Sequence, residues 1–201
     1  MAEIKILIEG VHKFVSDIKA EISCTTTLIK SDKNIIVDPG AFINRDKLID
    51  ALRREKLRSE DIDAIVLTHL HLDHIANIFL FPKAKIFLRF ISGKYPGQFQ
   101  KIDEGYLQRF DLLNEQIAKN VKIIETPGHT IDQISLVIKT KEGNVVITGD
   151  AIPSKEWTDQ NKKPVPDFVY SVDKFIESRR NILSIADYII PGHGKMFKVE
   201  K

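Results

Sequence analysis

Residues 68–74 read Thr-His-Leu-His-Leu-Asp-His and come directly after the apolar stretch Ala64–Leu67, which is typical of an interior β-strand. If the chain stays extended past that strand, alternate side chains point to the same side. His69, His71 and Asp73 are therefore predicted to face one way, and the last histidine adds a fourth ligand-type side chain where the backbone turns. A zinc motif on a helix would instead need spacings of three or four residues. This stretch predicts a metal site at the end of a strand.

The same design recurs further along the chain, where a ligand-type residue follows an apolar, strand-like run. Glycine stands beside each of these residues, which lets the backbone turn sharply and leaves room for the side chain to face inward. If the strands share a sheet, the ligand-type residues gather at one of its edges. They are His129 in Pro127–Thr130, Asp150 after Val145–Thr148, and His193 in Pro191–Gly194.

The composition is that of an ordinary globular protein. Of the 201 residues, 43% are hydrophobic and 29% are charged, which excludes a disordered chain. The net charge of +2 offers no broad attraction for nucleic acid or for an anionic membrane. The start lacks a signal peptide, no apolar run reaches membrane-spanning length, and Cys24 is the only cysteine. We therefore expect a cytoplasmic protein with a single domain over residues 1–201.

Strand and helix signals alternate along the chain, which predicts an α/β fold. Amphipathic patterns predict a helix at Arg45–Arg54, capped by Asn44, and another helix capped by Ser171. Helical character also runs from His74 to Leu80. Strands are predicted at Ile4–Ile8, Thr25–Ile29, Ile35–Val37, Ala64–Leu67, Lys85–Leu88, Val121–Glu125, Gln133–Ile138, Val145–Thr148 and Tyr188–Ile190.

The order of these motifs, HxHxDH followed by a single His, a Gly-Asp pair and another single His, resembles the metallo-β-lactamase superfamily of metal-dependent hydrolases. The resemblance covers nearly the whole chain. It implies a four-layer αββα sandwich with a dinuclear metal site at one edge of its two sheets. Two segments, His74–Pro82 and Ala186–Gly194, look most like those of the small single-domain members.

The resemblance also implies a role for each matched residue. The first metal ion would be held by His69, His71 and His129, and the second by Asp73, His74 and His193. Asp150 matches the carboxylate that bridges both ions. Asp38 matches an early aspartate that supports the metal loop without binding metal, and it comes after a predicted strand in the turn signal Asp38-Pro39-Gly40.

Each residue also has a purely structural interpretation. A single histidine such as His129 or His193 is more often a turn or core residue, and Asp38 or Asp150 could serve only a turn. As a set, the seven candidates favour metal binding, because crowded neutral histidines inside a protein need partners. His12 has no partner motif and is interpreted as a surface or core residue. Cys24 is expected to be a buried apolar residue away from every ligand segment.

The ligand types indicate the chemistry. Imidazole and carboxylate without thiolate suit Zn²⁺, Mn²⁺ or Fe²⁺, and affinity makes zinc the default, so we expect two divalent metal ions per chain. Metal lowers the pKa of bound water toward neutrality, and a hydroxide that bridges the ions is expected to attack a carbonyl or phosphoryl centre. Asp73 is the candidate catalytic residue, because it lies beside that water and can orient it and handle its proton.

The favoured substrate is a small ester, thioester or lactone, and no membrane partner is expected. A phosphodiesterase or nuclease is the main alternative, supported by Lys155, Lys162 and Lys163, although nucleic acid is not favoured as a partner. A non-catalytic metal-binding module is the third, but it would be expected to lack a ligand, and none is missing. Lactonases of the superfamily carry a tyrosine shortly after the bridging aspartate, whereas here Ala151 follows Asp150, which argues against lactonase activity. The bridging aspartate itself argues against β-lactam hydrolysis.

The loops at residues 92–106 and 153–170 are expected to form the substrate pocket, because loops at the rim of a fold supply specificity. Loop or packing roles are favoured for each polar or aromatic residue there, but four could line the pocket: Lys94, Tyr95, Trp157 and Tyr170. The sequence ends soon after His193, so we expect no appended helical domain like that of glyoxalase II.

Overall fold

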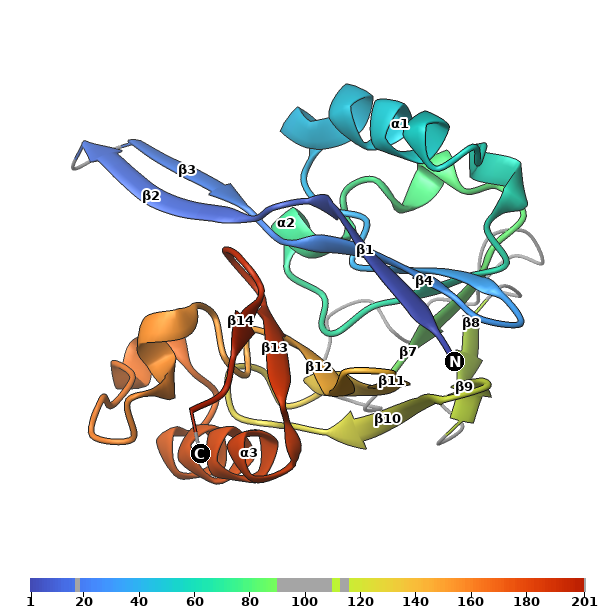
Figure 1. Cartoon of the computed structure of the whole chain (residues 1–201). Coiled ribbons are helices and arrows are strands. Elements are labelled where there is room, and N and C mark those ends of the chain that lie inside the picture. Colours follow the sequence, from blue (N-terminus) through green and yellow to red (C-terminus); the bar gives the residue numbers. More distant parts are fainter. Residues whose placement is uncertain (17–18, 90–109, 113–115, 201) are drawn as a thin grey trace.

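The computed structural model describes residues 1–16, 19–89, 110–112 and 116–200. Within those ranges, two six-stranded sheets face each other with helices on both outer sides (Figure 1). The first sheet has the strand order β1 (Glu3–Ile8), β4 (Thr26–Lys30), β5 (Asn34–Val37), β6 (Ala64–Val66), β7 (Lys85–Leu88) and β8 (Phe110–Leu112). The second has the order β14 (Phe197–Lys198), β13 (Tyr188–Pro191), β12 (Gly143–Gly149), β11 (Ile134–Thr140), β10 (Val121–Glu125) and β9 (Gln116–Ala118).

The apolar alternation of the strands produces the layers. In β5, Ile35 and Val37 face the second sheet and join the core between the sheets, whereas Ile36 faces outward. β12 does the same with Val145 and Ile147 inward and Val146 outward. Each sheet is therefore apolar on both faces and needs a helical layer outside it. This is the αββα sandwich, and the predicted fold class is confirmed.

The helical layers lie on the two outer faces (Figure 1). α1 (Arg45–Arg54) covers the first sheet through Leu48 and Leu52. α3 (Val172–Ile185) covers the second, and its predicted cap is present because Ser171 Oγ accepts a hydrogen bond from the backbone N–H of Lys174 at 3.3 Å. Asn44 occupies the predicted N-cap position of α1, but its side chain makes no cap hydrogen bond. No helix of the described ranges is both long and apolar enough to cross a bilayer.

Short helical turns complete the outer layers. They are η1 (Phe42–Asn44), η2 (Ser59–Asp61), η3 (Ile78–Leu80), η5 (Lys155–Thr158) and η6 (Pro166–Phe168), together with the one-turn helix α2 (Leu72–Ile75). The last two η turns lie in the region predicted to be irregular. The other predicted irregular region, from residue 92, falls mostly outside the described residues.

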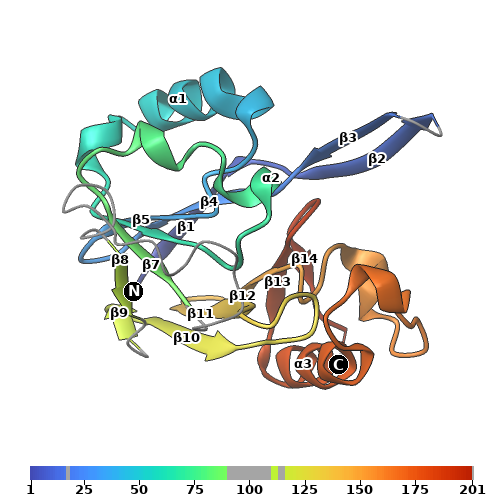
Figure 2. The same cartoon turned by 180° about the vertical axis from the view of Figure 1, so that it is seen from behind.

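The structure contains a hairpin that the sequence did not predict. β2 (Val11–Ser16) and β3 (Lys19–Ser23) form a hairpin that extends away from the sandwich in both views (Figure 2). Apart from Ser23, the described residues of this hairpin are exposed. It therefore buries no apolar face and lacks the pattern by which the other strands were predicted.

Candidate metal centre

The motif segment begins at the end of β6 and is held by its neighbour strand. The backbone N–H of Asp38, just past β5, donates to the carbonyl of Val66 at 3.0 Å. Asp38 in turn accepts from Thr68 twice, from the backbone N–H at 2.8 Å and from the hydroxyl at 2.7 Å. These bonds fix the point where the chain leaves the sheet, directly before His69.

The conformation of the motif differs from the extended segment that was predicted. The chain is extended only through His71, and α2 begins at Leu72, so Asp73 and His74 lie on the first turn of a helix. α2 ends at Ile75, and the helical character predicted through Leu80 resumes in η3 (Ile78–Leu80). The carbonyl of His74 accepts from the backbone N–H of Gly40 at 2.9 Å, and the Asn77 side chain donates to the carbonyls of Pro39 and Ala41, so the loop after β5 interrupts the helix.

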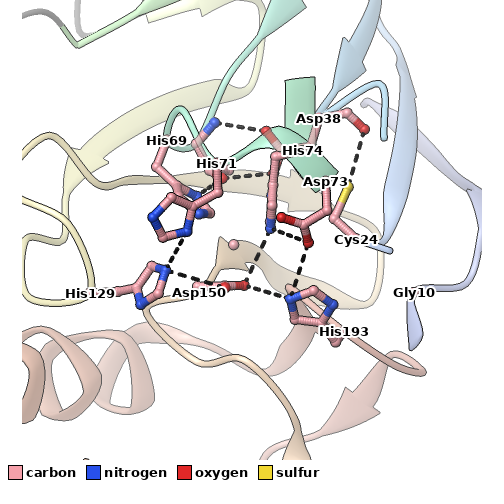
Figure 3. A network of polar contacts seen from close by, with 12 residues as sticks. Gly10, Cys24, Asp38, His69, His71, Asp73, His74, His129, Asp150 and His193 are labelled. Atoms are coloured by element: carbon pink, nitrogen blue, oxygen red, sulfur yellow. Dashed lines mark hydrogen bonds and ion pairs between the residues drawn. The ribbon is translucent and has the colours of Figure 1, made fainter. Parts of the chain in front are cut away.

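Seven predicted side chains nevertheless converge (Figure 3). They form two groups, and the ligand-type atoms of each lie within 4.8 Å of one another. The first sheet supplies the motif residues, and the loops after β10, β12 and β13 of the second sheet supply the other three. The groups are His69, His71, His129 and Asp150, and then Asp73, His74 and His193.

Asp150 lies between the two groups. Its Oδ2 is 3.4 Å from His129 Nε2, while its Oδ1 is 3.3 Å from His193 Nε2 and 3.5 Å from His74 Nε2. Gly192 permits this approach, because a Cβ added there would collide with Asp150 Oδ1. One carboxylate therefore faces both histidine groups, as the family resemblance implied for a bridging ligand.

The histidines are oriented by partners outside the centre. His74 Nδ1 hydrogen-bonds Asp38 Oδ2 at 2.8 Å, His193 Nδ1 hydrogen-bonds the carbonyl of Ser23 at 2.9 Å, and His69 Nδ1 lies 3.1 Å from Thr68 Oγ1. In each ring the other nitrogen, Nε2, points into the centre. Such outer partners fix the tautomer and direction of a metal-binding imidazole. Asp38 adopts a φ of 50°, so it serves both the turn and the support of His74.

Several inward atoms have no hydrogen-bond partner within the described part of the chain. They are His69 Nε2, His74 Nε2 and Asp150 Oδ1, and all are buried. Leaving buried polar atoms unpaired costs free energy, and a cation that accepts lone pairs from all three would remove that cost. The residues present therefore fit a centre for divalent metal. His129 Nε2 and His71 Nδ1 lie 2.9 Å apart, so these two ring nitrogens also belong to the group formed with His69 and Asp150.

The pKa shifts divide the histidines by group. Burial lowers the pKa of His69 and of His129, so both rings are neutral near pH 7. Burial also disfavours charge on His74 and His193, but neighbouring groups outweigh it and raise both pKa values: Cys24, Asp38 and Asp150 act on His74, and Asp150 acts on His193. Burial would raise the pKa of Asp150, yet His74 and His193 hold it well below its usual range.

Two residues lie closer to the centre than expected. Cys24 is fully buried as predicted, but its expected distance from the ligand segments is wrong, because its sulfur lies 3.8 Å from the carbonyl oxygen of Asp38 and groups with His74. The pairing of β4 with β5 causes this, since it sets the start of β4 beside Asp38. Burial raises the pKa of the Cys24 thiol to about 11. His12 is exposed, but its ring centroid is 5.4 Å from that of His193.

A hollow of about 430 Å³ opens beside His71 and His129, and Tyr170 lines it, although a loop or packing role was favoured for this residue. Trp157 does not line it and instead packs edge-on against Phe175, with ring centroids 5.5 Å apart. Lys94 and Tyr95 lie outside the described residues.

Comparisons with known proteins agree with this geometry. A sequence model of the metallo-beta-lactamase superfamily matches residues 21–193. Metallo-beta-lactamase domain-containing protein 1 of Xenopus laevis is 29% identical, and the match covers 98% of this chain and 82% of the frog protein. The protein of that name from Rattus norvegicus is 32% identical over 82% of this chain and 63% of its own length, so the chain spans less than two thirds of the rat protein. A solved structure of a candidate metallo-beta-lactamase from Thermotoga maritima has a TM-score of 0.77 and 25% identity, over 98% of this chain and 99% of that one.

Proposed function

The chain belongs to the metallo-beta-lactamase superfamily, and from that premise we propose that it is a hydrolase that holds two divalent metal ions and cleaves a small ester, thioester or lactone. The observation that carries the proposal is a set of buried atoms without hydrogen-bond partners, His69 Nε2, His74 Nε2 and Asp150 Oδ1, of which the last two lie 3.5 Å apart in the centre. Zinc is the expected metal on affinity, and manganese or iron would suit the same ligands.

The ligand assignment follows from which ring atom faces inward. His69 Nε2, His71 Nδ1 and His129 Nε2 would hold the first ion, and Asp150, which lies between the two groups, would be a ligand in both positions. The second ion would be held by Asp73 together with Nε2 of His74 and of His193. The histidines of both groups are the kind of ligand that zinc takes in catalytic sites.

When bound, the ions would supply Lewis acidity that lowers the pKa of water and polarises the scissile group. Asp73 is the proposed catalytic residue, because it is the most exposed carboxylate of the centre and its Oδ2 lies 3.6 Å from His74 Nε2 and 3.8 Å from His193 Nε2. From that position it can orient the attacking water and take its proton. Asp38 acts only through His74, whose ring it holds in place.

The hollow beside His71 and His129 supports a small substrate. Its volume of about 430 Å³ is in the range of sites for small ligands. The lysines on which the nuclease alternative depends do not line it. Lys162 pairs with Glu156 at 2.9 Å and lies over the ring of Trp157, and Lys155 lines a different hollow. The carboxylic ester class is therefore favoured over phosphodiesters.

The test is a panel of substrates on protein loaded with zinc, manganese or iron. The panel holds p-nitrophenyl acetate, a small thioester, a small lactone and bis(p-nitrophenyl) phosphate. We expect turnover of at least one of the first three, and Asp73→Ala should reduce it by about 10² to 10⁴-fold. Asp46→Ala, which removes an exposed carboxylate of α1, should leave it unchanged.

Two results would contradict the proposal. Turnover of the phosphodiester alone would establish the nuclease alternative. Fully metal-loaded protein that turns over none of the four compounds would favour a non-catalytic metal-binding module.

A further inference from the structure

Apart from its two histidines, the charged side chains that line the hollow beside the metal centre have one sign. Apart from His71 and His129, the charged residues that line it are Asp132 and Asp167, and no lysine or arginine of the described residues does so. Neither carboxylate makes an ion pair within the described part of the chain. Such a lining attracts a positively charged group and repels a phosphate or carboxylate.

Asp132 is the less ordinary of the two acids. It is 2% exposed, and its Oδ1 has no hydrogen-bond partner among the described residues. The hydroxyl oxygen of Thr130, which also lines the hollow, is likewise buried without a partner. Because Asp132 Oδ1 is buried and unpaired, its negative charge is not offset by a hydrogen bond there, and it would act on a ligand in the hollow through that charge.

The rim of the hollow is aromatic. Phe168 and Tyr170 line it, yet they are 76% and 58% exposed. Tyr170 is held beside the centre because its backbone N–H donates to the carbonyl of His129 at 3.0 Å. Exposed aromatic rings next to carboxylates are the surroundings in which proteins bind ammonium and quaternary ammonium groups.

We propose that this hollow binds an ammonium or quaternary ammonium group of the substrate while the acyl group of the same molecule lies at the metal centre. The inference rests on the proposed function and narrows it to esters or thioesters of cationic alcohols or thiols. In the reaction, water adds to the acyl carbon, the bond from that carbon to the ester oxygen or thioester sulfur breaks, and the leaving group takes a proton. Acid and cationic alcohol or thiol are the products.

Arg89 donates to the carbonyl of Ile131, a lining residue, at 2.7 Å, but its side chain pairs with Glu125 at 2.8 Å and does not line the hollow. A second hollow, of about 470 Å³, has Lys155, Arg180, Lys198 and Glu200 among its lining residues and shares no residue with the first. The acidic lining at Asp132 and Asp167 is thus a property of the hollow beside the metal centre and does not reflect the net charge of the chain, which is +2.

The test compares two thioesters of one shape. Acetylthiocholine carries a trimethylammonium group, and S-(3,3-dimethylbutyl) thioacetate carries an uncharged tert-butyl group in its place. With zinc-loaded protein and a thiol reagent, we expect kcat/KM to favour acetylthiocholine by at least about tenfold. Asp132→Asn and Asp167→Asn should each bring that ratio down several-fold, and Asp167 is exposed, so its variant is not expected to disturb folding. Asp159→Asn, an exposed acid of the same loop that does not line the hollow, should keep the ratio.

Failure of the inference and failure of the proposed function give different results. Equal kcat/KM for the two thioesters, or a ratio unchanged in Asp167→Asn, overturns the inference and leaves the hydrolase intact. If neither thioester nor p-nitrophenyl acetate is hydrolysed, the proposed function fails, and calorimetric titration then decides the inference. Tighter binding of choline than of 3,3-dimethylbutanol supports it, and equal or absent binding of the two overturns it.

Discussion

Asp38 illustrates how one residue can serve the backbone and the site together. Its φ of 50° ends β5 in a turn, while its two carboxylate oxygens accept from Thr68 and hold Nδ1 of His74. With Nδ1 committed to this bond, Nε2 of His74 is left to face the centre. His193 is oriented in the same way, because its Nδ1 hydrogen-bonds the carbonyl of Ser23. The direction of each imidazole is therefore set by groups that do not themselves enter the centre.

This arrangement predicts the effect of replacing Asp38. Asparagine tolerates the left-handed backbone, so Asp38→Asn should fold, but its amide cannot support His74 as the carboxylate does. We expect affinity for the second metal ion to fall by about 10 to 100-fold, measured by competition with a fluorescent zinc chelator. Asp63→Asn, at an exposed turn position outside the centre, serves as the control. Unchanged affinity in Asp38→Asn would show that His74 does not depend on this bond.

The pKa shifts predict that acid empties the centre in two steps. Protons compete with metal for an imidazole, and the rings with raised pKa values, His74 and His193, compete most strongly. His69 and His129 have lowered pKa values and stay neutral to lower pH. As pH falls from about 8 to about 5, about half of the bound zinc should therefore leave first, from the second position. Zinc content after desalting at each pH measures this. Loss of both ions in one step, or an early step that persists in His193→Ala, would contradict the assignment.

Most strands and helices that bury an apolar face could be predicted from the sequence, whereas the hairpin and the short strands β8, β9 and β14 could not. β7, β10 and α1 begin and end where the pattern predicts. The hairpin of β2 and β3 was missed because neither of its faces is buried. Helical character was predicted over His74–Leu80, but it begins earlier, at Leu72, and is divided into α2 (Leu72–Ile75) and η3 (Ile78–Leu80), where the distant loop at Pro39–Ala41 bonds to His74 and Asn77. The apolar pattern of a segment predicts its own secondary structure, but it does not predict hydrogen bonds to segments that are distant in the sequence.

The site shows the same limit. The seven predicted candidates converge because they lie in the segments that follow β6, β10, β12 and β13 of the two sheets, and the positions of these segments are visible in the sequence. Cys24 and His12 could not be placed, since neither belongs to a motif. They reach the centre through the pairing of β4 with β5 and through the path of the hairpin, and both are tertiary events.

The loop after β13 leads to a prediction about Gly192. A methyl group there would collide with Asp150 Oδ1 and with the backbone of Gly149. Gly192→Ala should therefore displace the bridging carboxylate, lower the unfolding free energy by about 1 to 3 kcal/mol and reduce bound metal to about one ion or less per chain. Denaturant unfolding and metal analysis measure the two effects.

Gly194→Ala separates this collision from simple backbone strain. Gly194 has a φ of 120°, but a methyl group there meets no atom within 4 Å. It should cost about 1 kcal/mol of stability and leave metal binding as it is. A Gly192→Ala protein with full metal content would show that Asp150 can move without loss of the centre.

Across the molecule, the centre joins the two halves of the sandwich. The first sheet leads into His69, His71, Asp73 and His74, and the loops of the second sheet carry His129, Asp150 and His193. Neither half contains a complete set of ligands, so the two sheets must pack in this register for the inward atoms to meet. The seven candidate ligands therefore come together only when both sheets are packed against each other.

The most direct measurement is therefore a crystal structure of the protein purified without chelator, with anomalous diffraction recorded on both sides of the zinc absorption edge. Two peaks are predicted per chain, one among the rings of His69, His71 and His129 and one among Asp73, His74 and His193, with Asp150 in contact with both. A well-ordered centre without anomalous density, or with its ions bound by other residues, would contradict the account.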